Sequence, residues 1–251
     1  MSPGGHAIIT GASAGIGAAY ARALAGPCDS MLIVGRREGR LLALAGELAP
    51  GCRVATAAAD LATVEGQARV VEAIRQGPPP DLLINNAGFS TLGPFATSDL
   101  DPEQEMLHLH CDANLALTRA ALPAMLARDS GAVVNVASVA ALLALPGVAT
   151  YAATKAFLLS FSRSLRAELA ATGLRVQCLC PGYTRTEIHD RDSFAGFDAE
   201  RVPEEQWMSA EAVVADSLAA LEADRWLVVP GEHNRELLVK AARELEAALG
   251  A

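Results

Sequence analysis

The chain has 251 residues, of which 51% are hydrophobic and 20% charged, which suffices for one sizeable core in a single α/β domain. The formal net charge of −9 argues against nucleic acid and membrane surfaces as partners, because both are bound by clustered basic residues. No apolar run approaches the ~18 residues of a membrane span, no signal peptide is evident, and five cysteines without metal spacing favour a reducing, cytoplasmic location.

The N-terminal segment predicts a phosphate-binding turn between a strand and a helix. A short strand is expected over residues 6–10 and an alanine-rich helix over 18–25, with the sequence TGASAGIG between them. Gly11, Gly15 and Gly17 permit a tight turn and close approach of the backbone, and the helix N-terminus offers unpaired N–H groups to a pyrophosphate. The alternative is an ordinary loop, but the strand–turn–helix context favours a dinucleotide site.

The second strand, expected over residues 31–35, ends in Gly35-Arg36-Arg37. An acidic residue at this strand end would take a ribose 2′-hydroxyl, whereas an arginine accommodates a 2′-phosphate. The first acidic residue, Glu38, comes only after both arginines, and positive charge at a helix start is slightly unfavourable without another purpose. The sequence therefore predicts NADP(H) in preference to NAD(H), with two solvated arginines as the alternative.

Polar residues follow the next two predicted strands. Helices are expected over residues 38–49 and 64–76, and strands over 53–58 and 81–84. Asp60 either caps the segment after its strand or accepts from an adenine amino group. The segment 85–88, Asn-Asn-Ala-Gly, is either a plain turn or part of the ligand crevice that open α/β sheets form at their strand ends.

The central part of the chain predicts a long helix followed by another strand. The helix over residues 101–127 carries Asn114, a poor helix former, in its middle, so a local reason for this residue is plausible. His108 and His110 do not share a helix face and are predicted to be packing or surface residues rather than ligands. The strand is expected over residues 132–137.

Ser138 at the end of this strand and a helix over residues 150–171 present three polar groups together. Tyr151 and Lys155 are four residues apart and share a helix face. A free phenol has a pKa of about 10, and a nearby ammonium lowers that pKa by favouring the ionised form. Tyr151 could then exchange protons with a carbonyl or alcohol, although most Tyr-x-x-x-Lys pairs are a ring packed beside a solvated lysine.

The last third of the chain continues the alternation of strands and helices. Strands are expected over residues 175–180 and 226–229, and helices over 209–223 and 235–249. The irregular, charged segment 183–208 is predicted to be a lid over the active site. The alternation predicts an α/β fold with a seven-stranded parallel sheet and helices on both faces, in one domain over residues 1–251.

The motifs along the chain combine into one pattern. They are Thr10–Gly17, Asp60, Asn85–Gly88, Asn114, Ser138, Tyr151-x-x-x-Lys155, and Pro181-Gly182 with Thr186. Each is weak alone, but their order and their places on the predicted elements resemble the short-chain dehydrogenases/reductases in their compact single-domain form. The resemblance covers essentially the whole chain and implies a doubly wound Rossmann fold.

The resemblance implies roles for four residues in catalysis. Tyr151 would be the general acid in reduction and the base in oxidation, and Ser138 would hydrogen-bond the substrate oxygen. Lys155 would hold the nicotinamide ribose and lower the pKa of the phenol. Asn114 would hold a water that relays protons. Ala137 departs from the family, where a serine often precedes the catalytic one, but Ser138 is kept and activity is expected.

The resemblance also implies a site for NADP(H) and hydride transfer to a carbonyl carbon, with no metal. The implied cofactor-binding residues are Gly11, Ser13, Gly15, Ile16, Gly17, Arg36, Arg37, Asp60, Leu61, Asn86, Ala87, Gly88, Tyr151, Lys155, Pro181, Gly182, Thr184 and Thr186. Among them Arg36, helped by Ser13 or Arg37, would hold the 2′-phosphate. Asp60 would flank adenine, and Asn86 would contact the adenosine ribose.

The expected function is reduction of an apolar ketone or aldehyde, such as a 3-oxoacyl or ring ketone. The segment 139–148, one wall of the substrate pocket by position, has no charged or hydroxyl side chain, which favours an apolar compound. Arg185, Arg191 and Arg201 in the lid either receive an acid group or face solvent.

The sequence leaves two alternative functions open and also predicts a mode of assembly. A cofactor-binding regulator or scaffold without turnover is one alternative, because fold alone does not establish function. An alcohol dehydrogenase working oxidatively is the other. The helix over residues 235–249 extends beyond the point where many tetrameric members end, so a homodimer through the helices at 101–127 and 150–171 is expected.

Overall fold

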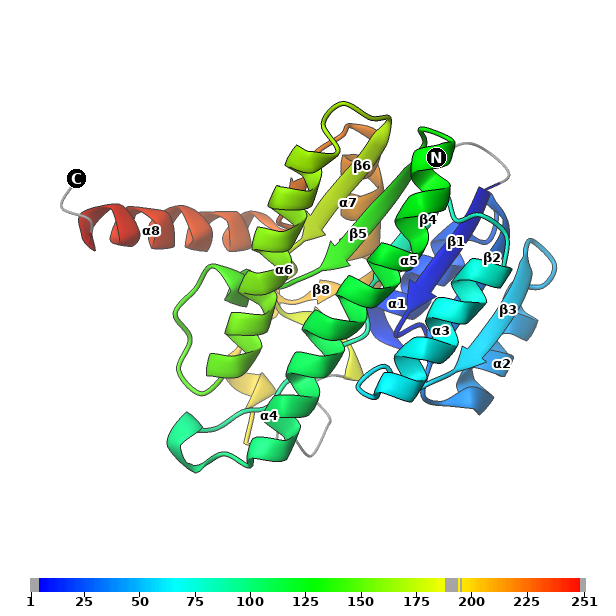
Figure 1. The fold of residues 1–251 in the computed structure, drawn as a ribbon. Coiled ribbons are helices and arrows are strands. Elements are labelled where there is room, and N and C mark those ends of the chain that lie inside the picture. Colours follow the sequence, from blue (N-terminus) through cyan, green and yellow to red (C-terminus); the bar gives the residue numbers. More distant parts are fainter. Residues whose placement is uncertain (1–4, 188–193, 195, 249–251) are drawn as a thin grey trace.

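A single parallel sheet organises the computed structural model, which describes residues 5–187, 194 and 196–248. Its seven strands lie in the order β3-β2-β1-β4-β5-β6-β9 (Figure 1). They are β1 (Gly5–Thr10), β2 (Cys28–Gly35), β3 (Arg53–Ala58), β4 (Leu82–Asn85), β5 (Gly131–Val136), β6 (Leu174–Leu179) and β9 (Leu227–Val228). The strand order reverses between β1 and β4, so the predicted doubly wound parallel sheet is confirmed.

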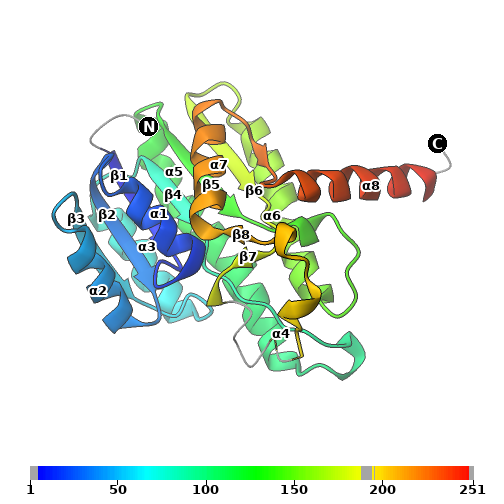
Figure 2. The same ribbon diagram turned by 180° about the vertical axis from the view of Figure 1, so that it is seen from behind.

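Helices cover both faces of this sheet. Helices α3 (Val64–Gln76), α5 (Ala113–Ala127) and α6 (Ala149–Glu168) lie on the face seen in Figure 1, and α1 (Gly15–Leu24), α2 (Glu38–Leu48) and α7 (Ala210–Glu222) on the face seen in Figure 2. The fully buried neighbours Ile8 and Ile9 in β1 belong to the two different cores. Successive side chains of a strand point to opposite faces, and an apolar strand therefore holds both helix layers in place.

The long helix predicted over residues 101–127 is interrupted. Helix α4 (Leu100–Leu107) is followed by a five-residue π-helical turn, His108–Asp112, and then by α5. The Nδ2 atom of Asn114 donates to the carbonyl groups of Leu109 and His110 over 3.3 and 2.7 Å. The asparagine thus satisfies carbonyl groups at the turn, which is a local reason for its presence inside the helix.

The predicted lid segment contains short regular elements. Strands β7 (Thr184–Arg185) and β8 (Met208–Ser209) pair in parallel, and short 3-10 turns are formed by Ala199–Arg201 and Glu204–Gln206. Residues 188–193 and 195 of this segment lie outside the described residues.

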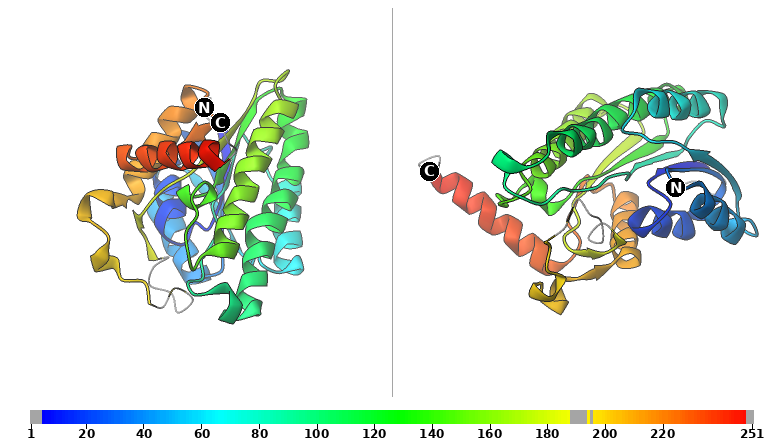
Figure 3. Two further views of the ribbon diagram at one scale, coloured as in Figure 1. Left: turned by 90° about the vertical axis from the view of Figure 1, so that its left-hand side faces the viewer. Right: turned by 90° about the horizontal axis from the view of Figure 1, so that it is seen from below.

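Helix α8 (Glu232–Ala248) projects away from the rest of the molecule (Figure 3). It begins three residues before the predicted start, and the predicted last residue, 249, lies outside the described part of the chain. Among the described helices, none combines the length and the apolar character that a membrane crossing requires.

Candidate active site and cofactor cleft

A cleft of about 1140 Å³ lies at the carboxyl ends of the central strands, where the strand order reverses. Of the residues predicted for the site, only Gly17 and Asn114 do not line it. Those that do are Gly11, Ser13, Gly15, Ile16, Arg36, Arg37, Asp60, Leu61, Asn86, Ala87, Gly88, Ser138, Tyr151, Lys155, Pro181, Gly182, Thr184 and Thr186. The fold therefore brings residues from distant parts of the chain together around one cleft.

The glycine turn is shaped for a phosphate group. Gly11 and Gly15 have φ angles of +67° and +53°, in the left-handed region that favours glycine. A Cβ atom at Gly17 would collide with the Gly11 carbonyl and the Asn86 amide, so Gly17 allows α1 to pack against the turn. Helix α1 begins at Gly15, and the side chain of its N-cap residue, Ala14, caps no N–H group. This open helix end fits the pyrophosphate of a dinucleotide.

Two polar residues beside the turn make structural hydrogen bonds. The Nδ2 atom of Asn86 donates to the Thr10 carbonyl over 2.9 Å, and the Thr10 hydroxyl accepts from the N–H groups of Asn86 and Ala87. Asp60 accepts from the N–H of Ala62 over 3.0 Å in the turn before α3, whereas the N-cap residue of that helix is Thr63. The contacts of Asn86 with ribose and of Asp60 with adenine stay predictions.

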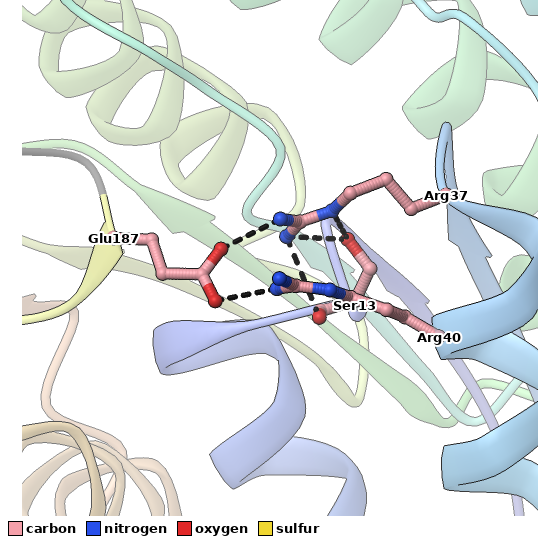
Figure 4. Close-up of polar contacts among 4 residues, drawn as sticks. All are labelled: Ser13, Arg37, Arg40 and Glu187. Atoms are coloured by element: carbon pink, nitrogen blue, oxygen red, sulfur yellow. Dashed lines mark hydrogen bonds and ion pairs between the residues drawn. The ribbon is translucent and has the colours of Figure 1, made fainter. Parts of the chain in front are cut away.

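The two arginines after β2 have different partners. The Nη1 atom of Arg36 lies 3.6 Å from a carboxylate oxygen of Asp60 and 3.4 Å from one of Glu105. The Nε and Nη2 atoms of Arg37 donate to the Ser13 hydroxyl over 3.2 and 3.1 Å, beside the glycine turn (Figure 4). The sequence predicted Arg36 as the main ligand of a 2′-phosphate, but in the structure Arg37 is the arginine that reaches Ser13.

Two further charged residues at this end of the cleft were not predicted. One carboxylate oxygen of Glu187 accepts from Nη1 of Arg37 over 2.6 Å, and the other pairs with Arg40 (Figure 4). Both guanidinium groups hold the pKa of the Glu187 carboxyl below its ordinary value. Arg40 could have been found, because it lies three residues after Arg37 on a helix.

Ser138, Tyr151 and Lys155 come together around the same cleft. Ser138 follows β5, Tyr151 lies in the first turn of α6, and Lys155 lies one turn later. The side chain of Ser138 hydrogen-bonds that of Tyr151. The Nζ atom of Lys155 lies 5.5 Å from the centre of the Tyr151 ring and donates to the Val136 carbonyl over 2.9 Å. The structure thus brings a phenol, a hydroxyl and an ammonium group together at one part of the cleft.

Burial dominates the ionisation of these groups. It raises the pKa of the Tyr151 phenol, and the hydrogen bond with Ser138 opposes the rise. Burial also lowers the pKa of Lys155, which is 4% exposed, to about 8. The lowered phenol pKa expected from the sequence is therefore not found, because loss of water around the phenol outweighs its neighbours.

His110 packs against the Tyr151 ring, a contact that the sequence did not predict. Its Nδ1 atom hydrogen-bonds the Thr154 hydroxyl over 2.8 Å, and that hydroxyl donates to the Tyr151 carbonyl over 2.8 Å. Its Nε2 atom accepts from the N–H of Phe89 over 3.3 Å. Because Thr154 donates to the carbonyl, Nδ1 of His110 carries the proton and the ring is neutral. Burial lowers the pKa of His110 well below its ordinary value, which agrees with this assignment.

Asn114 lies at the start of α5 and does not line the cleft. Its Nδ2 atom is used by the π-helical turn, whereas its Oδ1 atom is buried and accepts no hydrogen bond from the described part of the chain. Buried polar atoms usually have partners, so this oxygen is suited to a bound water. The predicted role of Asn114 in holding a proton-relaying water stays a prediction.

The substrate part of the cleft has mostly apolar walls. The predicted wall segment 139–148 contributes Val139, Ala140, Leu143, Leu145, Pro146 and Val148, and the segment after β4 contributes Phe89, Ser90 and Leu92. The predicted lid contributes Tyr183, Phe194 and Phe197, and Tyr183 packs against Trp207 with 5.4 Å between ring centres. Helix α8 adds three residues that the sequence did not indicate: His233, Asn234 and Leu237. These surfaces suit a bulky apolar compound.

Two arginines of the predicted lid pair with neighbouring carboxylates outside the cleft. Arg185 pairs with Glu204 and lies 5.2 Å from the centre of the Trp207 ring. Arg201 pairs with Asp198 over 2.9 Å, and neither arginine lines the cleft. Arg191 lies outside the described residues. For Arg185 and Arg201 the solvent-facing alternative is the one that the structure supports.

The fold and the cleft are those of nucleotide-binding oxidoreductases. The short chain dehydrogenase family matches residues 5–193, and the chain belongs to this family. It is 38% identical over 189 residues to a short chain dehydrogenase of Pseudocercospora fijiensis, a match that spans 74% of this chain and 61% of that protein.

Two solved structures resemble the whole chain. A short-chain dehydrogenase from Sphingobium yanoikuyae in complex with NADPH matches with a TM-score of 0.86 and 33% identity, over 97% of this chain and 95% of that chain. The bulky-bulky ketone specific alcohol dehydrogenase from Comamonas testosteroni matches with a TM-score of 0.82 and 28% identity, over 98% of this chain and 94% of that chain.

Proposed function

We propose that this protein is an NADPH-dependent reductase of bulky, apolar ketones or aldehydes. The observation that carries the proposal is the single cleft lined by Ser138, Tyr151 and Lys155, by apolar walls, and by the Ser13–Arg37 pair beside the glycine turn. The NADPH bound to the Sphingobium relative and the bulky ketones named for the Comamonas enzyme support the two halves of the proposal.

Each catalytic side chain has a task in the proposed reaction. Bound NADPH supplies a hydride to the carbonyl carbon. Tyr151 donates its phenolic proton to the carbonyl oxygen, because a phenol is protonated at neutral pH even at its ordinary pKa of about 10. Ser138 hydrogen-bonds the same oxygen and orients it. The cation of Lys155, close to the Tyr151 ring, stabilises the phenolate that remains.

Turnover of a substrate panel tests this function. The panel contains bulky aryl ketones, ring ketones, aldehydes and keto acids, each offered with NADPH and with NADH. We expect consumption of NADPH with the bulky apolar ketones and slower consumption with NADH. Turnover confined to keto acids would contradict the substrate class, and the absence of any turnover would contradict the reductase assignment.

Replacing Arg37 by Ala is expected to weaken NADPH binding by about 10- to 100-fold and NADH binding by less than about threefold. The guanidinium of Arg37 is the one joined to Ser13, and a charge-assisted hydrogen bond to phosphate is lost in the variant. Arg36→Ala is the matched comparison, because Arg36 faces two carboxylates, and its loss for NADPH should be smaller. Equal losses for both cofactors in Arg37→Ala, measured by calorimetric titration, would refute the 2′-phosphate role.

A further inference from the structure

The structure assigns a further role to Glu187: its carboxylate competes with the 2′-phosphate of NADPH for Arg37 and Arg40. Glu187 is thereby a specificity-determining residue: it weakens the binding of NADPH, leaves the binding of NADH unchanged, and so reduces the difference between the two affinities. The inference rests on the proposed function and extends it.

The hydrogen bonds of Arg37 are divided between two partners. Nε and Nη2 are engaged by Ser13, and the remaining nitrogen, Nη1, donates to Glu187. Arg40 holds the second carboxylate oxygen of Glu187 (Figure 4). One anion therefore bridges two guanidinium groups, an oxygen to each, which is also how phosphate oxygens bind arginine. Glu187 satisfies the arginines as a phosphate would.

The position of this anion is close to the glycine turn. Ser13, Arg37 and Glu187 all line the cleft. Thr186, the residue before Glu187, packs onto the turn so closely that a Cβ atom at Gly15 would lie 2.9 Å from its Cγ2 atom. This contact fixes the backbone beside Glu187 at the predicted pyrophosphate turn, and the ion pair with Arg37 directs its carboxylate to the predicted site of the 2′-phosphate.

The two cofactors differ in the charge that they bring to this place. A phosphate monoester carries a charge of about −1.5 to −2 at neutral pH, so it repels the carboxylate and must take over its arginines. The 2′-hydroxyl of NADH is neutral and leaves both ion pairs intact. Binding of NADPH therefore includes the cost of breaking the pairs of Glu187, and binding of NADH does not.

The size of this cost follows from the exposure of the pairs. The side chains of Arg37, Arg40 and Glu187 are 40%, 51% and 45% exposed, so water and salt weaken both ion pairs. Breaking two such exposed ion pairs is expected to weaken NADPH binding by between about 2-fold and 30-fold. The arginines still bind the stronger anion, so NADPH remains preferred.

The test measures dissociation constants of NADPH and NADH by calorimetric titration for the native protein, Glu187→Gln and Glu47→Gln. Glutamine keeps the shape of Glu187 and removes its charge. Glu47 is a matched control, because its carboxylate pairs with Arg22 over 2.7 Å and does not line the cleft. We expect Glu187→Gln to bind NADPH between about 2-fold and 30-fold more tightly, with NADH changed by less than about 2-fold. Glu47→Gln should leave both constants unchanged.

Four outcomes would overturn the inference. Weaker NADPH binding in Glu187→Gln would mean that Glu187 holds the arginines in place for the phosphate. An unchanged NADPH constant, or an equal gain for NADPH and NADH, would mean that the carboxylate does not compete with the 2′-phosphate. If the native protein bound neither cofactor, the proposed function would fail and the inference with it.

Discussion

Replacing Tyr151 by Phe is expected to lower kcat by a factor of about 10² to 10⁴ and to change NADPH affinity by less than about threefold. The substitution removes the proposed proton donor and keeps the aromatic ring. That ring lies edge-on to His110 with 5.9 Å between ring centres, and the backbone of Tyr151 still accepts from Thr154. The first turn of α6 should therefore stay in place while the proton transfer is lost.

The chain offers a matched control for this variant. Tyr20 is fully buried in α1, donates to Ser217 and does not line the cleft. Tyr20→Phe should lower stability by about 1 kcal/mol and leave kcat unchanged. Steady-state kinetics on both variants checks the prediction. A kcat for Tyr151→Phe close to that of the native protein would exclude the phenol as the proton donor.

Replacing Lys155 by Met is expected to abolish turnover and to raise the free energy of unfolding at neutral pH. The chain has only two lysines, and Lys155 is 4% exposed. Burial lowers its pKa from 10.5 to about 8, which corresponds to a cost of about 3 kcal/mol for the buried ammonium. Met fills the same space without a charge, so the variant does not bear this cost. Loss of the hydrogen bond from Lys155 to the Val136 carbonyl offsets about 1 kcal/mol of the gain in the free energy of unfolding.

The pH dependence of this gain has a definite sign. Between about pH 8 and pH 10.5 the unfolded chain holds the Lys155 proton and the folded chain does not, so the native protein becomes more stable as the pH rises. Below about pH 8 both states are protonated and the full cost of burial is present. The advantage of Lys155→Met should therefore be largest at neutral pH and shrink toward pH 10.5.

Urea unfolding at roughly pH 7 and pH 10 measures this difference. Lys240, the other lysine, is exposed on α8, so Lys240→Met should change the free energy of unfolding little at either pH. A Lys155→Met protein that is less stable than the native protein at neutral pH would show that the ammonium is stabilised in the fold.

The features that the sequence predicted well are those set by neighbouring residues. The strand predicted over residues 6–10 forms part of β1, where Ile8 and Ile9 are fully buried. The glycine turn depends on Gly11 and Gly15, whose positive φ angles few other residues adopt. Tyr151 comes close to the end of β5 because α6 packs along β5 and β6 and begins at the carboxyl edge of the sheet.

The features that the sequence did not predict depend on distant contacts. Glu187 meets Arg37 across 150 residues of chain, and no local pattern announces that pairing. The π-helical turn that carries His110 depends on packing against α6, since its imidazole reaches Thr154 there. The raised pKa of Tyr151 reflects burial, which is a property of the whole fold. Periodicity and spacing carry no information on such contacts.

In the proposed reaction this cleft transfers a hydride from NADPH to a ketone carbon. The most direct test uses NADPH that carries deuterium in both positions of nicotinamide C4, together with a bulky aryl ketone, and mass spectrometry of the product. We expect an alcohol with deuterium on the carbinol carbon, formed by the native protein and, in the same time, in amounts about 10² to 10⁴ times smaller by Tyr151→Phe. Tight binding of NADPH without any labelled alcohol across the ketone panel would contradict the reductase assignment and favour a cofactor-binding protein without turnover.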